Sequence, residues 1–171
     1  MMIGREMGDN MNIIARPATI NDDEALTKIS FASKRHWKYP EEYLEIWRDE
    51  LTITPLYIIN NILYVAEEDG QALGYFSLVE VTENFWSGKV LVNKGFWLDH
   101  LFILPQYIGQ GIGTKLISVL KEKCKEMKID KVSIFADPNA KGFYDKIKAH
   151  YLGEVPSSIE GRTVSLYELF I

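Results

Sequence analysis

Several kinds of residue and segment are scarce in this sequence, and each scarcity excludes a class of protein. Cysteine occurs once, at Cys124, so neither an intrachain disulfide nor a metal site built from several cysteines can form, and a reducing compartment is favoured. No apolar run is long enough to span a bilayer, and residues 1–6 lack the apolar segment of a secretory signal. The sequence therefore predicts a cytoplasmic protein without a membrane segment.

Positive charge is also in short supply. Lys and Arg number 19 against 24 Asp and Glu, which gives a formal net charge of -5. This balance argues against general attraction to nucleic acid or to anionic lipid, so an anionic ligand has to be held by local geometry. We expect no nucleic-acid partner, no membrane partner and no metal.

Repeats, low-complexity tracts and long linkers are missing as well. A chain of 171 residues, 47% of them hydrophobic, suits one domain with a sizeable core. Residues 1–10 are polar and contain glycine, which is typical of a loose leader. We therefore predict a leader at 1–10 and a single domain at 11–171.

The hydrophobic pattern predicts alternating strands and helices, in an α/β (α+β) fold. The expected elements of the first half are a strand at 12–16, a helix near 22–32, a loop at 33–39, a helix around 41–51, a short turn opened by Thr54-Pro55, and strands at 62–67 and 72–82. Asp69-Gly70 between the last two strands is a dipeptide favoured in tight hairpins, so these strands should pair antiparallel. The second half continues with a strand at 96–104, a helix at about 112–127, a strand at 131–136, a helix at 138–148 and two strand-like runs around the loop 156–161.

A glycine-rich turn, Gly109-Gln110-Gly111-Ile112-Gly113, joins a predicted strand to a predicted helix. The unpaired N–H groups and the dipole of a helix N-terminus attract an anion, and phosphate is the natural guest. Glycine removes the Cβ atoms that would keep phosphate oxygens away from the backbone. The order Gly113-Thr114-Lys115 does not match a nucleotide P-loop, and the third glycine comes one position too early for a dinucleotide-binding fingerprint.

Two stretches carry a more specific likeness. One reads Leu98-Asp99-His100-Leu101-Phe102-Ile103-Leu104-Pro105, then Gly109-Gln110-Gly111-Ile112-Gly113-Thr114-Lys115-Leu116, and the other reads Asp137-Pro138-Asn139-Ala140-Lys141-Gly142-Phe143-Tyr144-Asp145-Lys146. The first resembles the acetyl-CoA motif of the GNAT superfamily of N-acetyltransferases, and the second resembles its second cofactor motif. The resemblance implies the GNAT fold, a mixed central sheet of about six to seven strands flanked by helices, antiparallel in its N-terminal part, with a V-shaped splay at the acetyl-CoA site.

Two positions depart from the family's pattern. Ile108 stands at the first position of the phosphate turn, where the family usually has Arg or Gln, and Gln106 lies two residues too early to replace it. Asp137 stands where many relatives have Asn, and Asn139 is close enough to supply an amide instead. Asp137 is equally suited to cap a helix that begins with Pro138.

The resemblance implies acetyl-CoA as cosubstrate, held by both motifs. The turn would hold its pyrophosphate, and the main chain of 101–103 would hold the pantetheine arm and the thioester. The implied cofactor-binding residues are Leu101, Phe102, Ile103, Ile108, Gly109, Gln110, Gly111, Ile112, Gly113, Thr114, Asp137, Asn139, Phe143 and Tyr144.

Acetyl transfer to an amine needs a neutral nucleophile, a polarised carbonyl and a proton for the departing thiolate. The resemblance places the Tyr144 hydroxyl near the cofactor sulfur, as the candidate acid. The base stays open between Asp99, His100 and water. Asp99 lies between Trp97 and Leu101 on one face of an apolar strand, which predicts a paired carboxylate or one with a raised pKa, and strand alternation places His100 on the opposite face.

Loops are expected to form the acceptor pocket, with His36 and Trp37 between the first helices and Trp86 after the second hairpin strand. Nothing separates a polyamine, an amino sugar, an amino acid or a peptide N-terminus, so the prediction stops at a small-molecule primary amine. A hypothesis of another class is a sensor or interaction domain that binds acetyl-CoA without turnover, which Ile108 and Asp137 favour. Exposed edges of a mixed sheet predict a possible homodimer.

Overall fold

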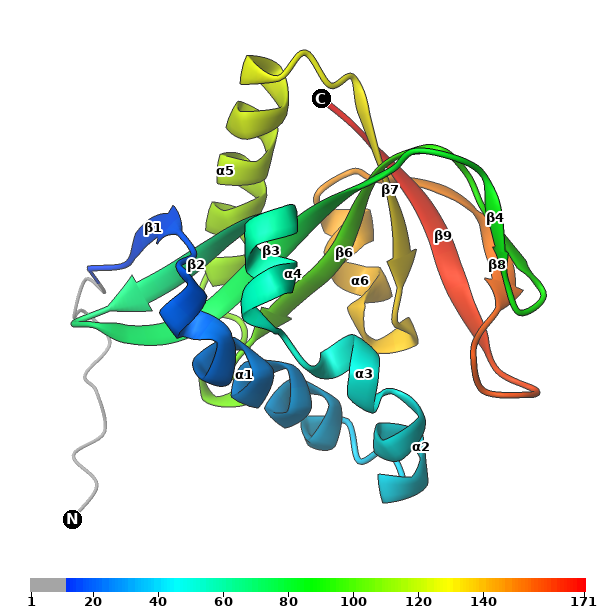
Figure 1. Ribbon diagram of the computed structural model, residues 1–171, viewed down its shortest axis with the longest axis horizontal. Helices are drawn as coiled ribbons and strands as arrows, with labels where there is room; N and C mark the ends of the chain where they lie inside the picture. Colours follow the sequence, from blue (N-terminus) through cyan, green and yellow to red (C-terminus); the bar gives the residue numbers. More distant parts are fainter. Residues whose placement is uncertain (1–11) are drawn as a thin grey trace.

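A seven-stranded mixed sheet organises the computed structural model, which describes residues 12–171 (Figure 1). The predicted leader at 1–10 lies outside the described residues. The strand order across the sheet is β1-β2-β3-β6-β7-β9-β8. The strands are β1 (Ile14–Pro17), β2 (Ile62–Glu68), β3 (Gln71–Val81), β6 (Gly95–Ile103), β7 (Lys131–Ala136), β8 (His150–Pro156) and β9 (Thr163–Phe170). The pairing of β6 with β7 is parallel, and the other pairs are antiparallel, as in the predicted mixed sheet.

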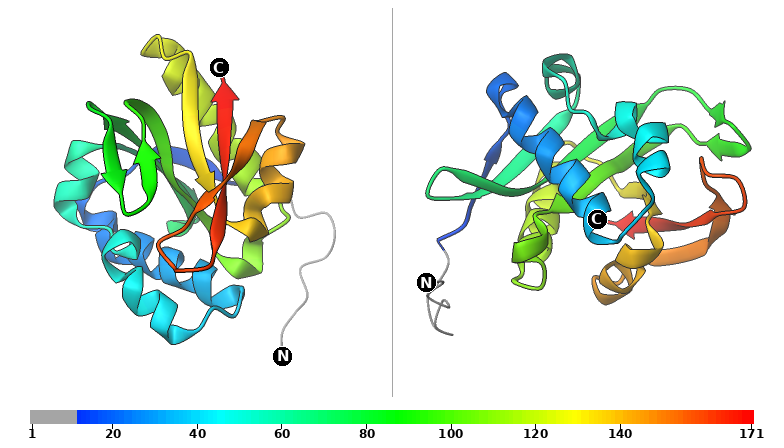
Figure 2. Two further views of the ribbon diagram at one scale, coloured as in Figure 1. Left: turned by 90° about the vertical axis from the view of Figure 1, so that its right-hand side faces the viewer. Right: turned by 90° about the horizontal axis from the view of Figure 1, so that it is seen from below.

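Helices cover both faces of this sheet, as the right-hand view of Figure 2 shows. One face carries α1 (Asp23–His36), α2 (Glu41–Ile46), α3 (Arg48–Leu51) and α4 (Pro55–Asn60). The other face carries α5 (Ile112–Glu126) and α6 (Lys141–Lys146). Each face has its own apolar core, with Leu26, Val65 and Tyr75 under α1 and α4, and Phe76 and Leu116 under α5. The core residues therefore alternate along the strands between the two layers.

The predicted β2–β3 hairpin and the predicted helix after the glycine turn are confirmed closely. The β2–β3 hairpin turns at Asp69-Gly70, whose φ angles of 50° and 80° are those of a tight turn with both central residues left-handed. The buried stripe of α5 consists of Leu116, Ile117, Leu120 and Cys124. Cys124 is thus a core residue of α5.

Other predicted boundaries are wrong. The loop expected at 33–39 begins only at Trp37, because α1 continues to His36 and Ser33 is buried, where its hydroxyl donates to the Ile103 carbonyl at 2.8 Å. The helix expected at 41–51 is divided at Trp47 into α2 and α3. The helix expected at 138–148 consists of a 3-10 helix at Pro138–Ala140 followed by α6. The segment with Trp86 forms an unpredicted hairpin of β4 (Phe85–Ser87) and β5 (Val90–Val92), which turns at Gly88.

Strands β6 and β7 separate soon after they meet. Their register covers only Phe96 with Val132 and Trp97 with Ser133. Beyond these pairs, β6 continues to Ile103 with β3 on its other side, while β7 continues to Ala136 with β9. The expected V-shaped splay is thereby confirmed, and its opening lies along the second half of β6.

Candidate active site

The glycine turn forms an open cradle at the start of α5. Gly109 and Gly111 have φ angles of 82° and 83°, which side chains rarely adopt, and a Cβ at either position would meet nothing within 4 Å. A Cβ at Gly113 would instead lie 3.1 Å from the Phe143 ring. Gly109 and Gly111 are thus required for their left-handed backbone conformation, and open space lies beside them. Gly113 is required because the Phe143 ring packs against it.

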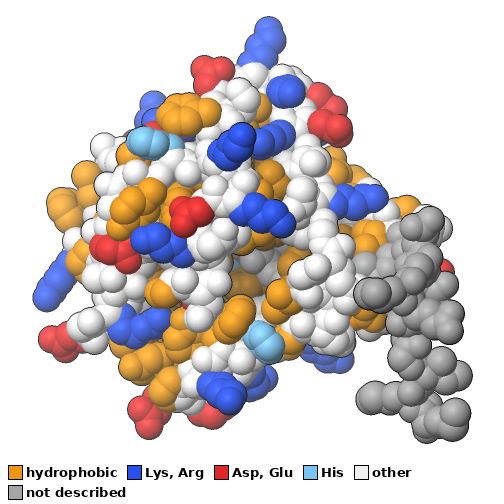
Figure 3. Space-filling view, turned by 180° about the vertical axis from the view of Figure 1, so that it is seen from behind, with side chains coloured by type: hydrophobic (Ala, Val, Ile, Leu, Met, Phe, Trp, Pro, Cys, Tyr) orange, Lys and Arg blue, Asp and Glu red, His pale blue; other side chains and the backbone are white. Residues whose placement is uncertain are grey.

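Backbone donors point into this cradle. The N–H of Lys115 donates to the Gly111 carbonyl at 3.0 Å, so the N–H groups of Ile112, Gly113 and Thr114 precede the first such bond of α5. The first turn of α5 contains no acidic side chain. These donors and the helix dipole suit a pyrophosphate. Figure 3 shows this face of the molecule, where hydrophobic and basic side chains surround a central hollow.

Ile108 is 43% exposed, so its side chain points away from the core at the entrance to the turn. The neighbouring Gln110 amide donates to the Gln106 carbonyl at 3.3 Å and helps to fix the turn. An apolar Ile108 supplies no donor to a phosphate, which leaves the backbone N–H groups as the available donors at this point of the turn.

Tyr144 on α6 has an uncommitted hydroxyl in an otherwise buried position. The residue is only 5% exposed, and its ring lies 5.3 Å from that of Phe143 and 5.7 Å from that of Tyr167, measured between centroids. Burial raises the pKa of Tyr144, so the phenol stays protonated. Among the described residues, none hydrogen-bonds to this hydroxyl, and its oxygen is not enclosed. A proton is therefore available at this point.

The main chain of β6 passes along the splay, with its side chains on both faces. Leu101 and Ile103 pack into the core under α5, whereas Phe102 packs on the α1 side, 6.1 Å from the Tyr75 ring. Ser33 occupies one lone pair of the Ile103 carbonyl, as described above. Main-chain groups of Leu101 and Phe102 lie beyond the last β6–β7 pair, at the edge where a ligand can replace the missing strand.

A β-bulge at Asp99 overturns the prediction that Asp99 and His100 lie on opposite faces of the strand. Ser77 of β3 pairs with His100 and Leu78 pairs with Leu98, which leaves Asp99 as the extra residue. The bulge interrupts the strand alternation, so Asp99 and His100 approach each other, with Nε2 of His100 3.3 Å from Oδ2 of Asp99. The expectation that they face opposite sides is wrong, and so is the placement of Asp99 on the face of Leu101, which packs under α5.

Asp99 is paired, as one of the two predicted states requires, but it is not buried. Its side chain is 44% exposed, and the Tyr57 hydroxyl donates to Oδ2 of Asp99. The same Tyr57 hydroxyl lies 2.8 Å from Ser77 Oγ, which accepts the His100 N–H at 3.0 Å. These bonds fix the carboxylate against the bulge.

Two further titratable groups border Asp99. Burial lowers the pKa of His100 in spite of the neighbouring Asp99, so the imidazole is held in its neutral form. Desolvation, followed by repulsion from Asp99, raises the pKa of Glu50 on α3. Sequence analysis missed Tyr57 and Glu50, because neither belongs to a local motif and Tyr57 is 42 residues from Asp99 in the chain.

Asp137 caps the 3-10 helix that follows β7, which was one of its two predicted roles. Its carboxylate accepts from the Asn139 N–H at 2.9 Å, the Tyr39 hydroxyl at 2.9 Å and Lys34 Nζ at 2.8 Å. Burial alone would raise the pKa of Asp137, but Lys34 and these hydrogen bonds outweigh it and hold the pKa below its usual value. The Asn139 amide donates to Asp137 and Tyr39, so both candidate cofactor ligands have protein partners.

The three predicted acceptor residues are spread over two segments. The His36 and Trp37 rings meet edge-on at 4.6 Å at the end of α1, where both side chains are exposed. Trp86 lies on the β4–β5 hairpin and is 68% exposed. Within the described part of the chain, no ring contact joins Trp86 to His36 or Trp37.

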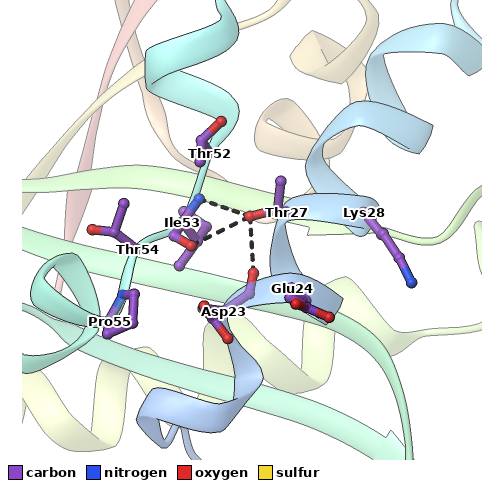
Figure 4. Close-up of a pocket in the computed structure, with 8 residues that line it drawn as sticks. All are labelled: Asp23, Glu24, Thr27, Lys28, Thr52, Ile53, Thr54 and Pro55. Carbon is purple, nitrogen blue, oxygen red and sulfur yellow. Dashed lines mark hydrogen bonds between the residues drawn. The ribbon is translucent and has the colours of Figure 1, made fainter.

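A separate pocket lies on the outer side of α1 (Figure 4). Thr27 occupies its floor, where the hydroxyl donates to the Asp23 carbonyl at 2.8 Å and accepts from the Ile53 N–H at 2.9 Å. This hydroxyl ties α1 to the segment before α4, so its role there is structural. Across residues 12–171, no group of three or more His, Cys, Asp and Glu side chains is placed to hold a metal ion. No helix within the same range is long and apolar enough to cross a membrane.

Comparisons with known proteins agree with this arrangement. The GCN5-related N-acetyltransferase from Rhodopseudomonas palustris is 20% identical, with a TM-score of 0.69 over 92% of this chain and 95% of that one. The PaiA N-acetyltransferase from Thermoplasma acidophilum, solved in complex with coenzyme A, is 21% identical, with a TM-score of 0.69 over 94% of this chain and 100% of that one. No curated protein matches the sequence.

These likenesses show a shared fold, and the family itself is shown by the sequence. The profile of the acetyltransferase (GNAT) family matches residues 25–148, which is more than half of the chain and includes the glycine turn and Tyr144. The chain therefore belongs to the GNAT family of acetyltransferases.

Proposed function

We propose that this chain transfers the acetyl group of acetyl-CoA to a primary amine of a small molecule, by direct attack of the amine on the thioester. The observation that carries the proposal is the position of the open glycine cradle directly after the splayed half of β6. A ligand can run from the cradle along that strand edge. The PaiA structure, which contains coenzyme A, supports the same use of the fold here.

The cradle and the strand edge have different tasks in this proposal. The N–H groups at the start of α5 hold the pyrophosphate, and the main chain at 101–103 holds the pantetheine arm beside β7. Phe143 packs against Gly113 and orients α6, so that Tyr144 faces the reacting sulfur. The side chains of Asp137 and Asn139 shape the end of β7 rather than provide free donors.

Proton transfer is assigned to residues on the two sides of the splay. Asp99 takes a proton from the ammonium group of the acceptor, directly or through water, so that the neutral amine attacks the thioester, while Tyr57 donates to one Asp99 oxygen and His100 lies beside it. His100 acts as a neutral partner of Asp99. The Tyr144 hydroxyl gives its proton to the departing thiolate; burial keeps the phenol protonated beforehand, and it has no protein partner among the described residues.

The remaining expectations belong to the same proposal. One sheet joins β1 near the N-terminus of the described chain to β9 near its C-terminus, which supports a single domain over 11–171. A buried lone cysteine supports a cytoplasmic location. The edge strand β8 offers a surface through which two copies can pair as a homodimer.

A thiol-release assay with acetyl-CoA and a panel of small primary amines tests the proposal, together with a thermal-shift measurement with the cofactor. We expect acetyl-CoA to raise the melting temperature and at least one amine to release free thiol above the rate with water. A thermal shift without thiol release from any amine would favour the sensor domain. No thermal shift and no release would contradict both.

A further inference from the structure

Arg162 lies in the loop between β8 and β9 and is stacked on three aromatic rings. Its guanidinium carbon is 4.7 Å from the centroid of the Tyr39 ring and 5.7 Å from those of Tyr43 and Trp47. Nη2 of Arg162 donates to the Tyr39 hydroxyl at 3.1 Å. The left-hand view of Figure 2 shows this loop beside α2 and α3. The aromatic rings fix the guanidinium in a defined plane.

The charges around Arg162 do not balance. Lys34 Nζ lies 2.8 Å from Asp137 and 4.7 Å from the centroid of the Trp47 ring, so Asp137 neutralises Lys34. Among the described acidic side chains, none forms an ion pair with Arg162. The cluster of Lys34, Asp137 and Arg162 thus carries one more positive than negative charge. Arg162 is half-buried, and a half-buried guanidinium with unused donors favours a planar anion such as a carboxylate.

This cluster borders the same opening as Asp99. Asp137 follows the end of β7, where β7 has already separated from β6. Lys34 Nζ lies 5.9 Å from the centroid of the Phe102 ring of β6, and the preceding Ser33 bonds to Ile103. Arg162 is linked to Asp137 through the Tyr39 hydroxyl. The cluster with Arg162 therefore lies on the α1 side of the splay, as Asp99 does.

We propose that Arg162 binds a carboxylate of the acceptor, so that the acetylated amine is an amino acid or another small amine that carries a carboxylate. The inference rests on the acetyl transfer proposed above. The ammonium end of such an acceptor is attracted to Asp99 and Glu50, and its carboxylate end to Arg162. This charge arrangement distinguishes an amino acid from a diamine, which has positive charge at both ends.

Matched pairs of acceptors test this specificity. Lysine and cadaverine differ only by the carboxylate, as do phenylalanine and phenethylamine. We expect kcat/KM to favour the amino acid of the productive pair by about 10- to 100-fold, since a charged hydrogen-bonded pair is gained. Arg162→Gln should remove most of this preference, and Arg162→Lys should leave an intermediate one, because a lysine keeps the charge without the planar fork.

Arg35→Gln is the matched control, because Arg35 is exposed, pairs with Glu41 and lies outside the cluster. It removes the same charge and should leave the preference unchanged. A circular-dichroism melt of each variant shows whether the β8–β9 loop variants fold. If Arg162→Gln does not fold, the test rests on Arg162→Lys. Its ratio of kcat/KM for the amino acid to kcat/KM for the matching amine is then compared with the wild-type ratio. An equal ratio in wild type and Arg162→Lys would then overturn the proposal.

A binding measurement separates this inference from acetyl transfer itself. Calorimetry with an N-acetyl amino acid and with its decarboxylated N-acetylamine requires no turnover. If the N-acetyl amino acid binds and this binding depends on Arg162, while no amine releases thiol, the carboxylate site is supported and the proposed acetyl transfer is contradicted. Equal acetylation of both members of each pair, or preference for cadaverine, would overturn the carboxylate site and retain the transfer.

Discussion

The two sides of the splay between β6 and β7 are built by different means. The cofactor side uses main-chain groups of one continuous stretch, 98–114, and its shape depends on left-handed glycines. The acceptor side uses side chains from segments far apart, as in the bond between Arg162 and Tyr39, which are 123 residues apart. The backbone conformation of a turn persists through most side-chain substitutions, whereas a network of side-chain contacts is altered when any one of its residues is replaced.

The largest effect is expected at Tyr144, where the proposed acetyl transfer brings the two sides together. Tyr144→Phe should lower kcat by about 100- to 10,000-fold, because the proton for the thiolate is lost. The affinity for acetyl-CoA should stay within about threefold, because the ring remains and the hydroxyl acts mainly in the transition state. Steady-state rates and calorimetry on the same two proteins give both values. Equal turnover would pass the acid role to Tyr107, Tyr151 or solvent.

The cofactor side is tested at Gly111. Gly111→Val places a branched side chain at a φ of 83° in the cradle, so it should abolish the stabilisation by acetyl-CoA. That stabilisation is about 2.7 kcal/mol when the ligand is at about 100 times its Kd. Thermal melts with and without acetyl-CoA measure it.

Gly70→Val is the control for backbone strain, because Gly70 has a φ of 80°, lies in equally open space and belongs to the β2–β3 hairpin. It should lower the melting temperature of the free protein and keep the ligand-induced shift. An unchanged shift in Gly111→Val would place the pyrophosphate elsewhere.

The acceptor side is tested at Asp99. Asp99→Asn should lower kcat/KM by about 10- to 100-fold near pH 7, with a smaller loss near pH 9, because fewer amine molecules then need a base. Tyr57→Phe removes one hydrogen bond to the carboxylate and should cost about tenfold with the same pH trend. Rates across this pH range measure both. If Asp99→Asn keeps its activity at the lower pH, the base is His100 or water.

The smallest expected effect is at Ile108, where the cofactor side is strengthened rather than broken. Ile108→Arg adds donors at an exposed position beside the cradle, so acetyl-CoA binding should tighten by about 0.2–1 kcal/mol. Calorimetry at low and high salt should show that the gain is lost as salt rises. A variant that fails to fold would contradict the assignment of Ile108 to the surface of the turn.

The cofactor side was predictable because its information is local. Three glycines, a preceding apolar strand and an amphipathic helix are adjacent in the sequence. Hydrophobic periodicity predicts the strand and the helix, and the glycines permit the left-handed turn between them. The cap role of Asp137 was predictable in the same way, from Asp137-Pro138 alone. The family resemblance added the mixed sheet, antiparallel in its N-terminal part, and the splay.

The acceptor side was not predictable, because its contacts join distant segments and its backbone departs from regular alternation. Tyr57 and Arg162 belong to no local pattern, and Glu50 was one acidic residue among many. Strand alternation placed Asp99 on the wrong face, since a bulge leaves no distinct mark in an apolar run. Trp37 and Trp86 were predicted to form the acceptor pocket from their residue type and their expected place in loops alone.

The bulge at Asp99 also makes the length of β6 important for evolution and for engineering. Because Asp99 is an additional residue in the strand, Leu98 and Leu101 both stay in the same core. The consecutive residues Asp99 and His100 then both face the proposed acceptor side. Deletion of Asp99 alone would remove the bulge and restore regular alternation, with Leu98 and Leu101 still in the core and His100 still on the opposite face. New acceptor preferences are therefore reachable by substitution at 99 and 100 or by loss of the bulged residue, while a deletion in the regular part of β6 would exchange the faces of the following side chains and damage the core.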